Sequence, residues 1–213
     1  MAIALGHDAL KREDGGYVIA GGIENMSLTP YCLPRSFQPK HLQTPVLVDH
    51  MMHDGLTSFG QMMGVIAQEN DLEFDRHCQD DYAILSHQRY LESQHHPIFD
   101  QHKIAINTGK TVVLDDECPK VFDRIRLKNM RPAFSNDGTI TAGNASALGD
   151  GAAMLLLASG KMASSSHVKA WLLDYACAST TPASFMLAPC QAIDKLLKQI
   201  GWHIQDVDLF EIN

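Results

Sequence analysis

The sequence has 213 residues, of which 45% are hydrophobic and 20% are charged, enough for one or two compact units with their own cores. The formal net charge of −8 argues against a nucleic-acid-binding surface, because phosphate binding requires clustered cations. No run approaches the roughly 20 apolar residues that span a bilayer, so we expect no nucleic-acid or membrane partner and a cytoplasmic location.

The first elements in the chain suggest part of an α/β unit. Residues 2–10 are compatible with a helix but lack an N-cap residue, so we expect them to be the tail of a helix that begins elsewhere. Residues 17–20 are apolar and β-branched, and they precede Gly21-Gly22 as a buried strand would. Residues 27–53 contain four prolines and form an irregular excursion. An excursion of this length indicates a functional loop or an inserted subdomain.

Two helices are predicted next, over residues 61–70 and 75–94. Asp75 is a good N-cap for the second helix. The apolar and aromatic residues of this helix fall near one face, which we expect to be buried: Cys78, Tyr82, Leu85 and Tyr90. Short extended runs follow at residues 103–106 and 111–114.

The last third of the chain is predicted to alternate strands and a helix. Residues 137–146 form a loop with little side-chain bulk. Residues 151–158 are apolar on both faces, as in a central strand. Strands are also expected over residues 168–178 and 206–213, and a helix over residues 188–200, with Pro189 in its first turn and Gly201 at its end. This alternation favours a mixed or parallel sheet covered by helices.

The cysteines and histidines give no sign of a disulfide framework or a metal site. The five cysteines are irregularly spaced without a C-x-x-C pair: Cys32, Cys78, Cys118, Cys177 and Cys190. We expect them to be reduced and partly buried, and Cys190, although it begins a helix, to be a buried structural thiol because no base is near it in sequence. One histidine-rich group fits no standard metal site, so no metal is expected: His95, His96, His102 and Cys118.

Four stretches occur in the order and near the spacing of one known family. They are residues 18–27 (VIAGGIENMS) with Pro30-Tyr31, residues 52–57 (MHDGLT) with Met63-Gly64, residues 131–153 and residues 208–213 (DLFEIN). The third stretch contains RPAF, GTITAGNAS and DGAA and is the most specific. Over nearly its whole length the chain resembles the thiolases.

The resemblance implies an α/β fold of layered sheets and helices, incomplete in this chain and interrupted by an inserted loop domain. Residues 1–26 would be the end of the N-terminal thiolase half, and residues 27–142 the loop domain that covers the substrate. Residues 143–167 would return to the N-terminal half, and residues 168–213 would start the C-terminal half.

The resemblance also implies an acyl-CoA C-acyltransferase, of the acetyl-CoA C-acetyltransferase type, with the coenzyme A thioester as substrate and no separate cofactor. In this family a cysteine thiolate takes the acyl group from coenzyme A. None of the five cysteines lies in the family's C-[GS]-S-[GS] context, and the family's histidine and second cysteine follow a motif whose asparagine is Asn213. We therefore expect the chain alone to bind acyl-CoA poorly and not to catalyse, and to form homo-oligomers if it folds. The alternative is a non-catalytic acyl-CoA-binding or interaction protein.

Eight residues are candidate site residues by resemblance. Ser146 would contact the pantetheine arm, and the small residues Ala142 and Gly143 would let the ligand approach the backbone. The acyl and pantetheine tunnel would be walled by Phe134, Met62 and Met63. Lys120 would lie near the nucleotide phosphates, and Asn213 would orient a catalytic water in an oxyanion hole.

Each candidate also has a structural interpretation. Ser146 could be a turn hydroxyl bonded to nearby backbone, and Phe134 and the two methionines could be core residues. Lys120 could be a solvated surface group. Met62 stands where acetyl-specific members commonly have histidine, so the resemblance does not predict the shape of the acyl pocket.

Overall fold

A computed structural model of the protein describes residues 1–12, 16–33, 46–53, 61–69, 74–121, 123–162 and 168–212. The chain divides into two compact units. Unit 1 consists of Met1–Asn25 and Asp150–Asn213, and unit 2 consists of Met26–Gly149.

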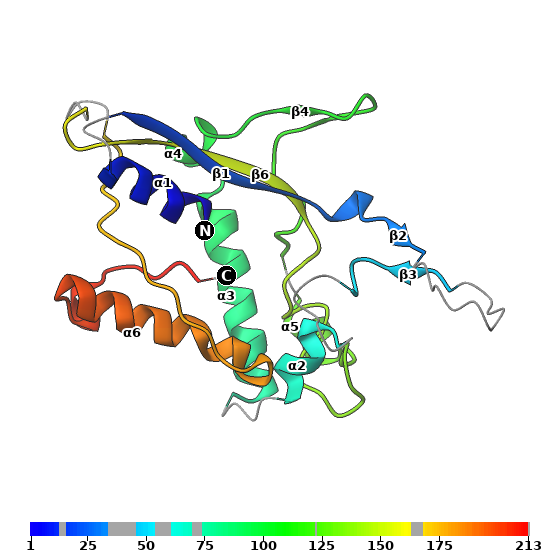
Figure 1. Ribbon diagram of the computed structural model, residues 1–213. Coiled ribbons are helices and arrows are strands. Elements are labelled where there is room, and N and C mark those ends of the chain that lie inside the picture. Colours follow the sequence, from blue (N-terminus) through cyan, green and yellow to red (C-terminus); the bar gives the residue numbers. More distant parts are fainter. Residues whose placement is uncertain are drawn as a thin grey trace, which may run out of the picture. The chain divides into compact units, whose positions relative to one another are not determined.

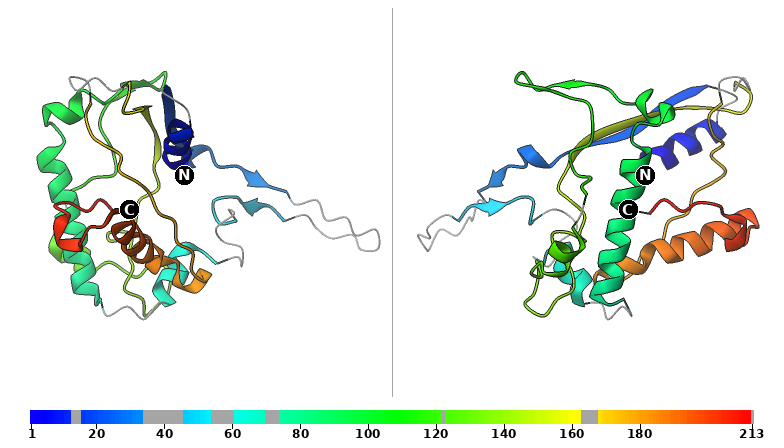
Figure 2. Two further views of the ribbon diagram at one scale, coloured as in Figure 1. Left: turned by 60° about the vertical axis from the view of Figure 1, so that its left-hand side comes forward. Right: turned by 180° about the vertical axis from the view of Figure 1, so that it is seen from behind.

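Unit 1 is built on a two-stranded antiparallel sheet with a helix packed on it (Figures 1 and 2). Strand β1 (Tyr17–Asn25) pairs with β6 (Asp150–Ala158) along its whole length. Helix α1 (Ala2–Arg12) includes the predicted helical residues 2–10 and lies against this pair. Gly6 makes the close approach possible, because a Cβ on it would lie 2.9 Å from Cδ1 of Leu157 and 3.2 Å from Cγ1 of Val18.

The other face of the β1–β6 pair is open, which corrects the prediction of a buried central strand. Residues 151–158 do form a strand, but Leu156 is 67% exposed and its partner Ile19 is 73% exposed. The strand pairing in the described part of the chain is antiparallel, where a mixed or parallel sheet was expected. The sequence run is apolar on both faces, but within the described residues only the α1 side is covered.

The C-terminal part of unit 1 contains the predicted helix, whereas the two predicted strands beside it are wrong. Helix α6 (Ala188–Ile200) carries Pro189 in its first turn and ends at Gly201, whose φ of 74° is left-handed. Short 3₁₀ turns flank it at η2 (Pro182–Leu187) and η3 (Ile204–Asp206). Residues 168–181 and 207–212 have no regular secondary structure. Alternating apolar residues make an extended segment, but a strand also needs a paired neighbour, and the described residues provide none there.

The regular structure in the described residues of unit 2 consists of helices and two short antiparallel strand pairs. Its elements are η1 (Met26–Leu28), β2 (Tyr31–Cys32), β3 (Val48–Asp49), α2 (Met63–Glu69), α3 (Arg76–Ser93), α4 (Pro97–Asp100), β4 (Ile106–Asn107), β5 (Val112–Val113) and α5 (Arg124–Lys128). Strand β2 pairs with β3 and β4 pairs with β5. Helix α3 contacts α5 (Figure 1). The prediction that Asp75 caps α3 is confirmed, since its carboxylate accepts from the backbone N–H of Cys78 at 2.8 Å.

The buried face of α3 is not the predicted one. Cys78 and Tyr82 are exposed, whereas Asp80 and Ile84 are buried. The hydrophobic pattern missed this face because a carboxylate occupies one of its central positions. Asp80 can be buried because it is paired with a cation and hydrogen-bonded, as described below.

The cysteines are free, as expected, but the expectation that they are partly buried holds only for Cys32. The other four are exposed. Cys190 is among them, because it shares a face of α6 with Asp194 one turn on, away from the apolar stripe of that helix. Among the described residues, no group of three or more potential ligands could hold a metal ion, and no helix has the length and apolar character needed to cross a membrane.

Candidate functional site

The candidate site is a hairpin of unit 2, residues 131–146, which we call the small-residue hairpin. Its two arms are joined by the backbone N–H of Ala133, which donates to the carbonyl of Ile140 at 2.8 Å, and by a bridge between Pro132 and Thr141. Four of the eight sequence-predicted site residues lie on it: Phe134, Ala142, Gly143 and Ser146.

Phe134 joins the hairpin to α2. Its ring packs on Gly64, where a Cβ would lie only 2.2 Å from the Phe134 Cζ atom. Met62 and Met63 directly precede Gly64, and the Met62 carbonyl accepts the N–H of Val65 at 2.9 Å, so these methionines form the first turn of α2. Both are half-buried. The structure therefore brings Phe134 to the turn that carries the two predicted methionines.

The second arm of the hairpin ends in a tight turn that begins at Thr141, which is 0% exposed. The Thr141 hydroxyl accepts the N–H of Gly143 at 3.2 Å, and the Thr141 carbonyl accepts the N–H of Ala145 at 3.0 Å. Ala142 and Ser146 are exposed, whereas Gly143 is buried. The turn thus exposes small side chains on a backbone that hydrogen bonds to the buried Thr141 hold in place.

A polar network that the sequence reasoning missed holds the hairpin to α2 and α3. The Gln68 side-chain carbonyl accepts the backbone N–H groups of Thr139 at 2.8 Å and Ile140 at 3.0 Å. Asn144 donates to the buried Asp80 carboxylate at 2.9 Å, and Asp80 is paired with Arg76 at 2.8 Å. The only sequence signal was an Arg and an Asp four residues apart on a helix, a spacing that usually marks an exposed pair.

The remaining two predicted site residues are not part of the hairpin. Lys120 is exposed, and its backbone N–H donates to Nδ1 of His87 at 3.2 Å. Burial, and then the charge of Lys120, lower the pKa of His87 below its usual value. Asn213 lies outside the described residues.

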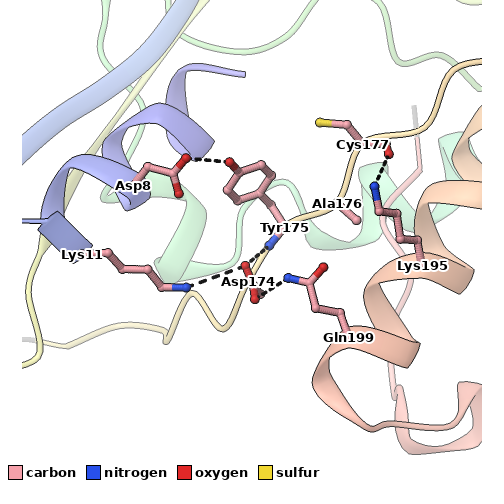
Figure 3. A pocket seen from close by; sticks show the side chains of 8 residues that line it. All are labelled: Asp8, Lys11, Asp174, Tyr175, Ala176, Cys177, Lys195 and Gln199. Atoms are coloured by element: carbon pink, nitrogen blue, oxygen red, sulfur yellow. Dashed lines mark hydrogen bonds and ion pairs between the residues drawn. The ribbon is translucent and has the colours of Figure 1, made fainter.

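Unit 1 contains a separate hollow of about 390 Å³ between α1, residues 174–177 and α6 (Figure 3). It is lined by Asp8, Lys11, Asp174, Tyr175, Ala176, Cys177, Lys195 and Gln199, none of which was a predicted site residue. The Tyr175 hydroxyl donates to Asp8 at 2.7 Å, and the Lys195 ammonium donates to the Cys177 carbonyl at 3.3 Å. The Lys11 ammonium lies 3.9 Å from the Asp174 carboxylate.

Hydrogen bonds shift the pKa values of side chains that line this hollow. The Tyr175 hydroxyl lowers the pKa of Asp8, and Asp8 in turn raises the pKa of Tyr175. The pKa of Asp174 is lowered first by the backbone N–H of Tyr175 and then by Gln199.

The helices, strands and small-residue hairpin together define an α/β protein of a known layered fold. The structure matches the crystal structure of Acat5 thiolase from Ascaris suum in complex with coenzyme A, with a TM-score of 0.85 and 34% sequence identity. The match covers 100% of this chain and 56% of that chain.

Sequence comparisons lead to the same family. Family models described as "Thiolase, N-terminal domain" and "Thiolase, C-terminal domain" match residues 1–161 and 166–213. The chain is 39% identical over 211 residues to acetyl-CoA acetyltransferase 1 of Arabidopsis thaliana and 36% identical over 225 residues to a probable acetyl-CoA acetyltransferase of Dictyostelium discoideum. The chain belongs to the thiolase family. The matches cover 92% and 100% of this chain but 50% and 52% of those proteins, so it spans about half the length of the curated relatives it matches.

Proposed function

We propose that this chain supplies the pantetheine-binding part of a thiolase that acts on acyl-CoA thioesters as an acetyl-CoA C-acetyltransferase. The observation that carries the proposal is the turn at the end of the second arm of the small-residue hairpin. A pantetheine arm is long and narrow, so a backbone that receives it must carry little side-chain bulk. Ala142 and Ser146 provide such a surface, and the buried Thr141 keeps it in place.

Two further features support the assignment. The Phe134 ring on the hairpin and the first turn of α2 bring apolar side chains together, which suits the non-polar part of a thioester ligand. The structurally similar Acat5 thiolase was crystallised with coenzyme A. In this proposal unit 2 is the substrate-covering domain, and Lys120 serves as a cation for the nucleotide phosphates.

The proposal includes no catalysis by the 213 residues alone. None of the five cysteines lies in the family's nucleophile motif. We expect weak binding of coenzyme A and no thiolysis of acetoacetyl-CoA. Measurable thiolysis by the purified chain would overturn this part of the proposal and leave the binding part standing.

Binding is tested by titrating coenzyme A into the ¹⁵N-labelled chain and following amide chemical shifts, which report even millimolar affinity. The shifts should concentrate at residues 142–146. Ala142→Tyr should block them, because it adds a ring to an exposed position of the turn. Ala105→Tyr, at another exposed alanine of unit 2, is the matched control and should leave binding unchanged. Shifts that are absent, or that survive Ala142→Tyr, contradict the proposal.

A further inference from the structure

The network below the small-residue hairpin begins with a charge pair on α3. Nε of Arg76 lies 2.9 Å and 2.8 Å from the two carboxylate oxygens of Asp80. The same guanidinium donates from Nη1 to the Met130 carbonyl at 3.3 Å, next to the start of the hairpin. Asp80 is only 8% exposed. A buried carboxylate that binds a cation is a strong acceptor for one further donor.

That further donor is Asn144. Its side-chain N–H₂ group donates to Asp80 at 2.9 Å and to the Thr139 carbonyl at 3.1 Å, and its side-chain oxygen accepts the backbone N–H of Thr141 at 2.7 Å. Both amide hydrogens and the oxygen of Asn144 are therefore used. Asn144 thus fixes the second arm of the hairpin at Thr139 and Thr141 and ties that arm to α3.

Replacing the side-chain amide of Asn144 should cost hydrogen bonds of this network. Aspartate at this position would set a second carboxylate against Asp80, and alanine would leave the Thr141 N–H and the Thr139 carbonyl without this partner. Asn144 also lies between the exposed Ala142 and Ser146, so any shift of its side chain moves the backbone that carries both.

We propose that Asp80 and Asn144 are positioning residues: they hold residues 139–146 in the conformation that receives the pantetheine arm. They act through the backbone of the hairpin. The link to ligand binding depends on the proposed function, whereas the hold on the hairpin can be tested without any ligand.

The test compares Asp80→Asn, Asn144→Asp and the double variant in the full chain. In Asn144→Asp, the amide hydrogens of residues 139–146 should exchange with solvent about tenfold faster or more, because two hydrogen-bond donors are lost and two carboxylates meet. Affinity for coenzyme A should fall by a similar factor. In the double variant the new amide at position 80 can donate to the new carboxylate at position 144. The double variant should therefore bind coenzyme A several-fold more tightly than Asn144→Asp alone.

Asp81→Asn is the matched control. Asp81 is the next residue on α3 and pairs with Arg124 on the exposed side of unit 2. Its loss should leave both hairpin exchange and coenzyme A affinity unchanged. If the charges of α3 only stabilised the helix in general, the changes at Asp80 and Asp81 would affect hairpin exchange alike. The double variant would then show no rescue.

The possible outcomes are distinct. Unchanged exchange at residues 139–146 in Asn144→Asp, or the absence of rescue, overturns the inference. If Asn144→Asp unfolds unit 2, seen as lost protection along α3, Asn144→Ala replaces it, because it removes the donor without adding charge. If the unmodified chain shows no shifts with coenzyme A, the proposed function fails, and the exchange comparison still decides whether the network positions the hairpin.

Discussion

The ring of Phe134 fills the space that a side chain on Gly64 would need: three of its atoms lie 2.2 to 2.5 Å from the position of a Cβ on Gly64. Two segments of unit 2 that lie 70 residues apart in sequence can therefore pack together because residue 64 has no Cβ atom. The glycine is needed here for close approach, since its φ is not in the left-handed region.

Gly64→Ala should therefore destabilise unit 2. Overpacking of this kind costs about 1–3 kcal/mol, which exceeds the gain of about 1 kcal/mol from replacing a helical glycine by alanine. Urea unfolding measures the difference. Phe134→Leu in the same chain should relieve the clash, so the double variant should be more stable than the sum of the two single changes implies. Gly149→Ala is the control, because its Cβ would sit at an ordinary 3.7 Å from Cys118 Sγ.

Asp75→Ala should lower the urea midpoint of unit 2, because the start of α3 loses the side-chain acceptor for the Cys78 N–H. Asp75→Asn keeps an acceptor and should retain most of the stability. The Cys78 N–H holds the pKa of Asp75 below its ordinary value of 3.8. The carboxylate contribution is therefore present above about pH 4 and is lost as the pH falls through 3.8 and below.

The acid-dependent part of this stability should disappear in both variants at Asp75. If Asp75→Ala and the unmodified chain lose stability equally between pH 5 and pH 3, the carboxylate does not cap α3. Unfolding followed by circular dichroism at each pH provides the measurement.

Tyr175→Phe should raise the pKa of Asp8 toward its ordinary value, because the phenol hydrogen bond is the largest cause of its lowering. A ¹³C-detected titration of the carboxylates reads this directly. Tyr17→Phe, at an exposed tyrosine of β1, is the control. In the unmodified chain the Tyr175–Asp8 bond is present below pH 10 and is lost as the pH rises through the raised pKa of Tyr175. An unchanged Asp8 titration in Tyr175→Phe contradicts this assignment.

Gly201→Ala should destabilise the end of α6 by about 1–2 kcal/mol, because a left-handed φ of 74° strains any residue with a Cβ. Gly201→Asn should be milder, since asparagine tolerates this conformation. Amide exchange at Leu197 to Ile200 reports the fraying. Equal protection in the alanine and asparagine variants would show that the φ angle does not govern this end of the helix.

The sequence predicts best what depends on local chemistry. Helix α6 has its bounds marked by Pro189 and Gly201, and α3 has its start marked by Asp75, because caps and turns use neighbouring residues. The family followed from the run at residues 131–153, whose small residues proved to form the hairpin.

What the sequence could not predict depends on distant partners. Residues 168–178 have the composition of a strand, but composition does not say whether a neighbouring strand exists. The burial of Asp80 could not be predicted for the same reason, because its donor Asn144 is 64 residues away in sequence. A helix face that carries Arg76 and Asp80 has the pattern of a solvent-exposed face, and only the fold shows that the hairpin covers it.

The pairing of β1 with β6 also has a consequence for the order in which the protein is made. Tyr17 pairs with Ala158, and all of unit 2 is encoded between them. At the usual pace of translation, β1 leaves the ribosome on the order of ten seconds before its partner strand exists. Unit 2 can therefore fold first, while the apolar β1 waits unpaired, and a holding chaperone would have its longest opportunity to bind the nascent chain at this strand.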